Sequence, residues 1–323
     1  MATIYYDSDC NLGLVKDKTI AIIGYGNQGR AQALNMRDSG CTSIIVGSRK
    51  DSSYDQAVED GFAVKPIEEA AKEADIIFML LPDEYAPQIY EESIAPGLEP
   101  GNILNFASAY NITFKKIVPP AFVDVVMAAP RMIGDGVRQM FLRGEGFPSF
   151  VGVAQDASGK ALCKAIGSTK KGAIEVTFDD ETMLDLMAEQ GTWPIIYHVF
   201  DESFKLLAET MGHPEEAVLM EAYLSKEPMY MMEKAAELGM YRQMPFHSHT
   251  SQFGQLRSFH MFDPAPIREF LREQYDQIKD GTFTKAWDEE QQVNDLATLE
   301  KLRDEALSCE MSKAEERTFE KLK

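Results

Sequence analysis

The chain of 323 residues is long enough to form two domains, each with its own hydrophobic core. Its composition, 45% hydrophobic and 26% charged residues, is that of a globular protein that stays in water. A formal net charge of −20 argues against binding to a nucleic acid, whose phosphate backbone requires an excess of lysine and arginine. The same charge is compatible with an enzyme that acts on small molecules.

The cysteines and the hydropathy pattern bear on the cellular compartment of the protein. Cys10, Cys41, Cys163 and Cys309 have no C-x-x-C spacing, so we interpret them as reduced thiols rather than as a disulfide framework. No apolar stretch approaches about 18 residues, so no membrane span is expected. The N-terminus lacks a basic region followed by an apolar core, which argues against a secretory signal. These features predict a cytoplasmic protein.

The most informative stretch is an apolar run over residues 19–23 that leads into the motif G-Y-G-N-Q-G at residues 24–29. A helical pattern follows at once, and a strand–turn–helix context is what makes this motif typical of dinucleotide binding. Gly24 would permit the tight turn, Gly26 would let a pyrophosphate approach the backbone, and Gly29 would let the helix pack on the strand. The helix N-terminus would meet the phosphate charge. An ordinary glycine turn is the alternative.

The residues after the second predicted strand, 43–47, bear on the choice of cofactor. NAD enzymes usually place an acidic side chain at this strand end, whereas NADP enzymes use arginine and hydroxyl groups for the 2′-phosphate. Four residues favour NADPH, namely Arg49, Lys50, Ser52 and Ser53. Asp51 weakens this prediction, because its carboxylate could hold an unphosphorylated ribose, and a solvated polar loop is a further interpretation. We therefore predict NADPH, with NADH as the alternative.

The rest of the chain shows two different hydropathy patterns. Near-continuous apolar runs alternate with helical segments, as in a parallel sheet that is buried on both faces. These runs are residues 74–82, 102–106, 123–128, 149–154 and 173–178. From Asp179 onward, long amphipathic patterns rich in Met, Leu, Glu and Ala replace them. The predicted domains are a mostly parallel α/β domain over residues 1–178 and an all-helical domain over residues 179–323.

Three acidic residues of the helical half are candidates for a metal site. Asp185 and Glu189 are four residues apart, so on a helix both carboxylates lie on one face. Glu221 lies on a second predicted helix, residues 215–223. Carboxylates from facing helices suit Mg²⁺, which prefers hard oxygen ligands, and solvated surface carboxylates are the alternative. The five histidines form no H-x-x-x-H pair, and no nucleophile-elbow motif is present.

Taken in order, these motifs resemble the short-chain class of the ketol-acid reductoisomerase family over nearly the whole chain. The similar segments are residues 4–7, 24–29, 80–84, 155–159, 185–190 and 281–287. The resemblance implies an N-terminal Rossmann domain and an all-helical, knotted C-terminal domain that pairs with a second subunit. It also implies NADPH and two Mg²⁺ ions. The implied reaction is alkyl migration in an acetohydroxy acid, followed by reduction of the resulting 2-keto acid to a 2,3-dihydroxy acid.

The resemblance assigns roles to residues at matching positions. Asp185 would bridge the two metal ions, Glu189 would hold the first, and Glu221 of the partner subunit would hold the second. Ser248 would touch the substrate carboxylate. The cofactor would be lined by Gly24, Tyr25, Gly26, Asn27, Gln28, Gly29, Leu81, Pro82, Asp83, Glu84 and Gly134.

Four positions depart from the family pattern. They are Ser108 in place of the catalytic histidine, Arg131 in place of the active-site lysine, Asp135 in place of a second histidine, and Ser225 in place of a glutamate. A serine hydroxyl cannot buffer a proton near neutral pH as an imidazole does. A metal site that loses one carboxylate should bind its second ion less tightly. Glu227 is not expected to replace the lost glutamate, because it lies about 240° around a continuous helix from Glu221.

These departures predict a divergent member in which the cofactor half is retained and the substrate half is changed. We expect an NADPH-dependent, Mg²⁺-assisted oxidoreductase that reduces a 2-keto-acid-like or acetohydroxy-acid-like substrate. Ser108 or a metal-bound water would relay the proton, Glu189 would act through the metal, and Arg131 would bind an anionic group.

The alternatives for the function and the expected partners follow from the resemblance and its departures. The alternatives are a genuine ketol-acid reductoisomerase of branched-chain amino acid biosynthesis, a non-catalytic NADPH-binding regulatory protein, and an enzyme like the hydroxyacid dehydrogenases or imine reductases. The expected partners are a small anionic substrate and at least one further copy of the chain, with active sites shared between the copies. No nucleic acid or membrane partner is expected.

Overall fold

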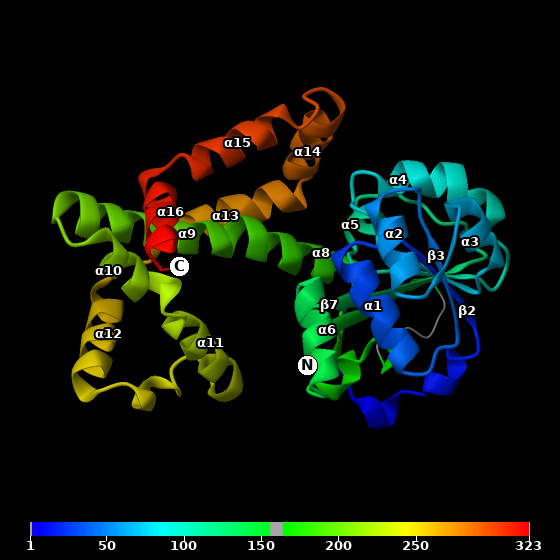
Figure 1. The fold of residues 1–323 in the computed structure, drawn as a ribbon, viewed down its shortest axis with the longest axis horizontal. Helices are drawn as coiled ribbons and strands as arrows, with labels where there is room; N and C mark the ends of the chain where they lie inside the picture. Colours follow the sequence, from blue (N-terminus) through cyan, green and yellow to red (C-terminus); the bar gives the residue numbers. More distant parts are fainter. Residues whose placement is uncertain (1, 156–163, 323) are drawn as a thin grey trace. The chain divides into compact units, whose positions relative to one another are not determined.

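The computed structural model describes residues 2–155 and 164–322 of the chain. It contains two compact units, Met1–Leu184 and Asp185–Lys323. The division falls inside the helix α8 (Phe178–Met187), a few residues after the boundary at residue 178 that the sequence predicted. In Figure 1 the strands belong to the first unit, and the second unit is drawn entirely as helices and their connections.

Within the described residues, nine strands form the sheet of the first unit, in the order β1-β9-β8-β7-β6-β5-β2-β3-β4. The strands are β1 (Ile4–Tyr5), β2 (Thr19–Ile23), β3 (Ser43–Gly47), β4 (Ala63–Lys65), β5 (Ile76–Met79), β6 (Ile103–Phe106), β7 (Asp124–Pro130), β8 (Ser149–Gln155) and β9 (Ala173–Glu175). The pairs from β4 to β7 are parallel, whereas β8 is antiparallel to β7 and β1 is antiparallel to β9. The predicted mostly parallel α/β domain is confirmed.

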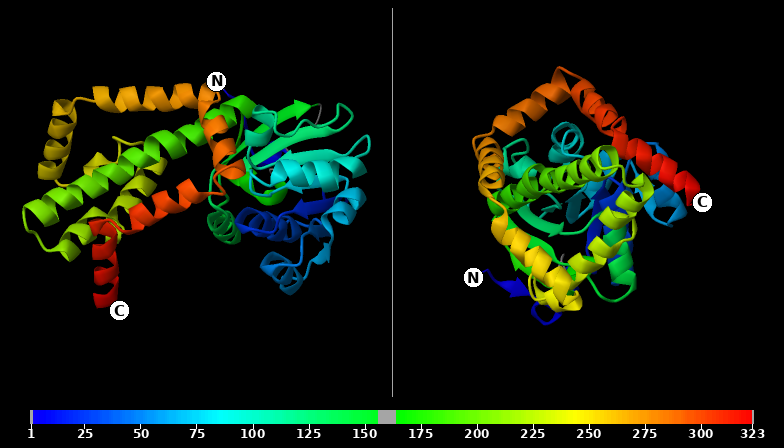
Figure 2. Two further views of the ribbon diagram at one scale, coloured as in Figure 1. Left: turned by 90° about the horizontal axis from the view of Figure 1, so that it is seen from above. Right: turned by 90° about the vertical axis from the view of Figure 1, so that its left-hand side faces the viewer.

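Helices cover both faces of this sheet (Figures 1 and 2). They are α1 (Asn27–Asp38), α2 (Ser52–Glu59), α3 (Ile67–Glu73), α4 (Ala86–Ile89), α5 (Tyr110–Thr113) and α6 (Gly134–Leu142), with shorter turns η1 (Asp7–Asp9), η2 (Leu12–Leu14), η3 (Tyr90–Ile94), η4 (Ala95–Gly97) and η5 (Ser168–Lys170). One core cluster joins α1 and α6 to the sheet through residues such as Met36 and Val137. Another joins α3 and η3 to the opposite face through residues such as Ala70 and Tyr90.

The chain direction of the sheet identifies where a ligand can bind. β2 has β3 on one side and β5 on the other, so the strand order reverses there. In open α/β sheets, ligands bind outside the carboxyl ends of the strands at such a switch point. The glycine motif directly follows β2 and therefore lies at this position.

The second unit consists of helices throughout the described residues, as predicted. After α8 come η6 (Ala188–Thr192), α9 (Trp193–Phe204), η7 (Lys205–Thr210), α10 (Glu215–Leu219), η8 (Met220–Leu224), α11 (Glu227–Leu238), η9 (Met244–Phe246), α12 (His249–Met261), α13 (Ala265–Lys279), α14 (Thr282–Gln292), α15 (Ala297–Leu307) and α16 (Glu310–Lys321). The segments η6, η7 and η8 are π-helical. Among the described residues, no helix has both the length and the apolar character to cross a membrane.

The second unit buries little of its apolar surface within one chain. Its buried apolar cluster consists of Phe204, Val218, Leu219 and Ala314. Large apolar side chains elsewhere in the unit are exposed, including Phe253 at 70% and Met261 at 68%. Such an apolar surface is typical of a protein–protein interface.

The helical segment that carries Glu221 does not continue to Glu227, although the angle predicted between these residues assumes a continuous helix. It stops at Leu224, Lys226 adopts a left-handed backbone with φ of 65°, and α11 begins at Glu227. Pro228 explains this break, because a proline has no N–H and its ring clashes with the carbonyl four residues earlier in a continuous helix. The assumption that Glu221 and Glu227 share one helix was therefore wrong, and the angle of about 240° between them does not apply.

Candidate cofactor site and active site

The glycine motif folds as a turn in which backbone packs directly on backbone. Gly24 has φ of 98°, and a Cβ atom there would lie 2.5 Å from the carbonyl oxygen of Leu80. A Cβ atom at Gly29 would lie 1.9 Å from the carbonyl oxygen of Gly24. At Gly26 no atom lies within 4 Å of the corresponding position, so the backbone there is open to an incoming group. This is the geometry that a dinucleotide pyrophosphate needs at a helix N-terminus.

A cavity of about 440 Å³ lies beside this turn. It brings together the glycine loop and the first residues of α1, α2 and α6, and its lining includes Tyr25, Gly26, Asn27, Arg30, Ser52, Ser53, Gly134, Asp135 and Arg138. A Cβ atom at Gly134 would lie 2.2 Å from the carbonyl oxygen of Asn27, so glycine is what lets α6 approach α1. The Gln28 Nε2 atom donates to the carbonyl oxygen of Met132 at 2.8 Å and ties the same two elements together.

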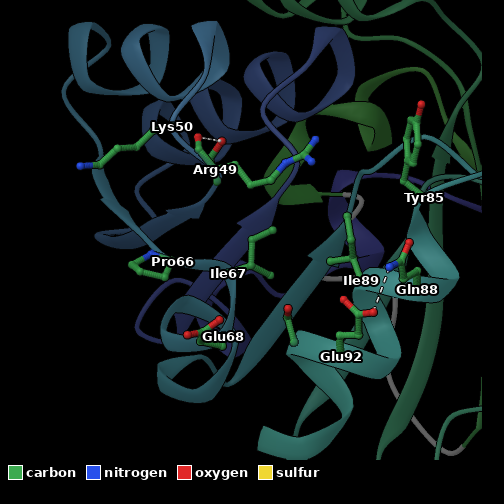
Figure 3. A pocket seen from close by; sticks show the side chains of 11 residues that line it. Arg49, Lys50, Pro66, Ile67, Glu68, Tyr85, Gln88, Ile89 and Glu92 are labelled. Atoms are coloured by element: carbon green, nitrogen blue, oxygen red, sulfur yellow. Dashed lines mark hydrogen bonds between the residues drawn. The ribbon is translucent and has the colours of Figure 1, made fainter.

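A second cavity, of about 430 Å³, lies at the ends of β3 and β4. Ile67 of α3 and Ile89 of α4 form opposite apolar walls, as Figure 3 shows. The Arg49 side chain extends across the cavity, whereas that of Lys50 points away from it (Figure 3). The cavity therefore combines two apolar walls with a cationic side chain. The polar residues of its lining include Glu68, Gln88 and Glu92.

Asp51 has a structural role at the start of α2. Its Oδ1 atom accepts hydrogen bonds from the backbone N–H groups of Ser53 at 3.0 Å and Tyr54 at 3.1 Å. This is the standard N-cap interaction, which satisfies amides that have no partner inside the helix. An aspartate at this position is thus explained without a ribose, and the residues around it keep the character expected for a 2′-phosphate.

The turn at residues 81–84, expected on the nicotinamide side, follows β5. The Asp83 Oδ1 atom accepts from the Asn111 Nδ2 atom at 3.0 Å, which connects this turn to α5. The backbone N–H of Tyr85 donates to the carbonyl oxygen of Pro82 at 3.0 Å and closes the turn. The turn is therefore fixed beside the residues that follow β6.

A buried glutamate joins the two departures from the family pattern that lie at adjacent strand ends. Ser108 follows β6 and Arg131 follows β7. Glu181 of α8 is fully buried, and its carboxylate accepts from the Arg131 Nη2 atom at 2.7 Å and from the backbone N–H of Ala109 at 2.9 Å. The Arg131 guanidinium also lies over the ring of Phe150, 4.8 Å from its centroid. Glu181 therefore fixes the backbone beside Ser108 and the direction of Arg131.

Sequence analysis did not identify Glu181. The one available signal was its position four residues before Asp185, which places both carboxylates on one helix face. Burial of a charge depends on the tertiary partner, and Arg131 lies 50 residues away in the chain.

The acidic candidates of the second unit differ in exposure within one chain. Asp185 is half-buried, while Glu189 in η6 and Glu221 in η8 are exposed. In the described part of the chain, no three His, Cys, Asp or Glu side chains are arranged to hold a metal ion. The donors are chemically suited to Mg²⁺, but one chain does not complete such a site. Ser248 is the N-cap of α12, where its hydroxyl accepts from the backbone N–H of Ser251 at 3.3 Å.

Two sequence features fall on residues that the structure does not describe. Cys163 is one of these residues, and of the segment 155–159 Gln155 alone is described.

Two family models match this chain. The model described as "Acetohydroxy acid isomeroreductase, NADPH-binding domain" matches residues 14–173, and that described as "Ketol-acid reductoisomerase, C-terminal domain" matches residues 178–322. Together they cover most of both units.

Named relatives and a solved structure agree with these models. The ketol-acid reductoisomerase (NADP(+)) of Pyrobaculum calidifontis is 41% identical over 299 residues, which are 90% of each chain. That of Pyrococcus abyssi is 40% identical over 292 residues, 88% of this chain and 87% of the relative. The solved structure of an NADH-preferring ketol-acid reductoisomerase from an uncultured archean has a TM-score of 0.91, 33% identity and 98% coverage of both chains.

Two alanine substitutions in the glycine motif should have different effects, one on stability and one on cofactor binding. We expect Gly29→Ala to lower the free energy of unfolding by about 3 kcal/mol, because its Cβ would overlap the carbonyl of Gly24. Gly26→Ala should fold normally but bind reduced nicotinamide dinucleotides at least about tenfold more weakly, because its methyl group enters the open space. Urea denaturation and fluorescence titration of NADPH measure the two effects. Equal affinity in Gly26→Ala and the unmodified protein would contradict this assignment.

Removal of the buried carboxylate should destabilise the first unit. We expect Glu181→Ala to lower the free energy of unfolding by about 3–5 kcal/mol, because it leaves the Arg131 cation and the Ala109 amide without this partner. Glu181→Gln, which keeps an acceptor, should cost clearly less. Chemical denaturation of both variants is the test, and a loss below about 1 kcal/mol in Glu181→Ala would show that the ion pair is not a stabilising contact.

Proposed function

This chain belongs to the ketol-acid reductoisomerase family, and on that premise we propose that it reduces the carbonyl group of a small 2-keto-acid-like substrate with NADPH and Mg²⁺ in the cytoplasm. The observation that carries the proposal is the cluster of Ser108, Arg131 and Glu181. It puts a hydroxyl group and a fixed cation at neighbouring strand ends, with Ser108 at the position where the family pattern has a histidine. The carbonyl oxygen must gain a proton after the hydride reaches the carbon, and the Ser108 hydroxyl or a metal-bound water would relay that proton from solvent. An alkyl migration needs, in addition, strong polarisation of two adjacent oxygens by the metal ions, so the simple reduction asks less of this site.

The first unit has the shape and chemistry for NADPH. The open backbone at Gly26 and the N-terminus of α1 would hold the pyrophosphate, and the walls formed by Ile67 and Ile89 would hold the adenine. Arg49, Ser52 and Ser53 would hold the 2′-phosphate. The turn at residues 81–84 would lie on the nicotinamide side. When bound, the reduced nicotinamide supplies a hydride to the substrate carbonyl.

Arg131 and Ser108 would act on the substrate directly. The positive charge of Arg131 attracts an anionic group such as a carboxylate, and its contacts with Glu181 and Phe150 hold the guanidinium plane in one orientation. A pre-oriented guanidinium loses less entropy when it binds a planar anion. The Ser108 hydroxyl would donate a hydrogen bond to the oxygen that gains charge during reduction.

Asp185, Glu189 and Glu221 of the partner subunit would hold the magnesium, with Ser248 at the substrate carboxylate. The donor set is right for a hard cation, and within the described residues one chain does not gather three such groups. We infer that a second chain supplies the third carboxylate, while water completes the coordination of Mg²⁺. When bound, the ion polarises the substrate carbonyl.

The exposed apolar surface of the helical unit is the second argument for a partner. On α11 and α12 and their connection, large apolar side chains are exposed, among them Met229, Tyr230, Met232, Tyr241, Phe246, Phe253, Phe259 and Met261. A second copy of the same chain would bury this surface around a two-fold axis, as in most homodimers. We therefore infer at least a homodimer with active sites shared between subunits.

One alternative has specific support. Relatives that are named ketol-acid reductoisomerase (NADP(+)) share about 40% identity with this chain over most of its length, which favours the complete isomerisation and reduction. The NADH-preferring structural neighbour also keeps NADH as an alternative cofactor. Three retained carboxylates argue against a purely regulatory role.

Turnover assays separate these reactions. With purified protein, NADPH and Mg²⁺, we expect NADPH to be oxidised when 2-keto acids are added. The loss of absorbance of the reduced nicotinamide measures this oxidation. Ser108→Ala should lower kcat by about a hundredfold if its hydroxyl transfers the proton. Acetolactate is the comparison substrate, and its rapid Mg²⁺-dependent conversion to dihydroxyisovalerate would instead establish the full isomeroreductase reaction.

Mixed dimers test the shared site. Asp185→Asn and Glu221→Gln should each abolish Mg²⁺-dependent turnover while NADPH binding stays unchanged, because both residues lie outside the first unit. Co-expression of the two variants should restore about one quarter of the sites, since half of the dimers are mixed and each has one intact site. Mixed dimers without any activity would contradict the contribution of Glu221 by the partner subunit.

A further inference from the structure

Asp60, at the C-terminal end of α2, is the centre of a polar cluster that the proposed reaction does not use. Its Oδ2 atom accepts from the Tyr25 hydroxyl at 2.9 Å and from the Arg30 Nε atom at 2.7 Å, and its Oδ1 atom accepts from the Arg30 Nη2 atom at 3.0 Å. The Arg37 Nη1 atom donates to the main-chain carbonyl of Asp60 at 2.6 Å. One residue thus joins the phosphate loop, α1 and the end of α2.

The charge state of this cluster is well defined. The hydrogen bonds from Arg30 lower the pKa of the Asp60 carboxyl, and the hydrogen bond from Tyr25 acts in the same direction. Burial raises the pKa of the Tyr25 hydroxyl, and its hydrogen bond to Asp60 raises it further. At neutral pH Asp60 is therefore an anion that receives donors from a neutral tyrosine and a cationic arginine.

The bidentate pair fixes the Arg30 guanidinium at the cavity beside the phosphate loop. Arg30 lines that cavity together with Ser52 and Ser53, and 47% of its side chain is exposed. Nε and Nη2 are bound to Asp60, whereas Nη1 makes no hydrogen bond within residues 2–155 and 164–322. An arginine that is held on one edge presents its other donors in a fixed direction.

The remaining lining of this cavity favours an anion over a cation. Ser52 and Ser53 supply hydroxyl groups, and Asn27 begins the helix α1, whose N-terminus carries partial positive charge. Arg138 also lines the cavity, although its Nη2 atom is paired with Asp38 at 2.7 Å. Asp135 is the acidic residue of the lining. The lining itself thus holds two arginines and one carboxylate, and the carboxylates that pair with the arginines, Asp60 and Asp38, lie outside the lining.

We propose that Arg30 is a specificity-determining residue for the 2′-phosphate of the cofactor, and that Asp60 is the positioning residue that holds it there. The inference rests on the proposed use of NADPH. Asp60 acts through Arg30 rather than on the cofactor, and it also fixes the end of α2, whose first residues are Ser52 and Ser53. Asp51 caps the opposite end of the same short helix, so both ends of α2 are held.

The experiment compares three variants by their affinity for NADPH, NADH, adenosine 2′,5′-bisphosphate and 5′-AMP, measured by calorimetry. We expect Arg30→Gln to weaken NADPH and the bisphosphate by about tenfold to a hundredfold, and NADH and 5′-AMP by less than about twofold. Arg37→Gln is the matched control, because Arg37 contacts Asp60 but is not among the described residues that line the cavity. Its cofactor preference should stay that of the unmodified protein.

The sign of the effect in Asp60→Asn tests the positioning role. If Asp60 holds Arg30, this variant loses NADPH affinity, and Arg30→Lys loses it too, because an ammonium group cannot make the bidentate pair. If Asp60 is only a negative charge near the phosphate, Asp60→Asn gains NADPH affinity, which would overturn the proposal. Thermal melting identifies any variant that has failed to fold, and the Arg30 variants then decide alone.

The outcomes also separate this inference from the function on which it rests. An unmodified protein that binds neither NADPH nor NADH contradicts the proposed function. An unmodified protein that prefers NADPH, with the same preference in Arg30→Gln, leaves that function intact and overturns the role of Arg30.

Discussion

The cofactor half of this protein depends on main chain lying against main chain with no side chain between. Gly29 packs on the carbonyl of Gly24, and Gly134 packs on the carbonyl of Asn27. The first contact seats α1 on β2, and the second brings the start of α6 to the start of α1. Because these three elements converge, the open backbone at Gly26 faces a walled cavity rather than bulk solvent. The binding geometry is thus a product of tight packing elsewhere.

A different kind of contact organises the ends of β6 and β7. There a single buried carboxylate, that of Glu181, receives one backbone donor and one guanidinium donor from separate connections. A buried charge is tolerated because both donors reach it and because Phe150 covers the face of the guanidinium. An arginine at position 131 can serve this carboxylate as well as a lysine would, with a fixed plane in addition.

The features that could be predicted from the sequence are those that neighbouring residues determine, and the features that depend on distant residues were missed. The strand–glycine–helix pattern located β2, the turn and α1, and the apolar runs located most of the other strands. β1 and β4 were missed because two or three residues carry no periodicity. Glu181 was missed because its role comes from a partner distant in sequence. The break before Glu227 was readable from Pro228, and it was overlooked because the helix was extended from the resemblance. Whether the acidic candidates bind a metal stays a prediction.

The small core of the helical unit has a consequence for its stability. Its buried cluster, around Phe204 and Leu219, is small beside the apolar surface that remains outside it. In the proposed homodimer this unit would gain much of its free energy of folding from association, so its stability would follow mass action. Dilution would then loosen the second unit before the first, whose sheet has two cores of its own. The cellular abundance of the chain would set how much of it is assembled.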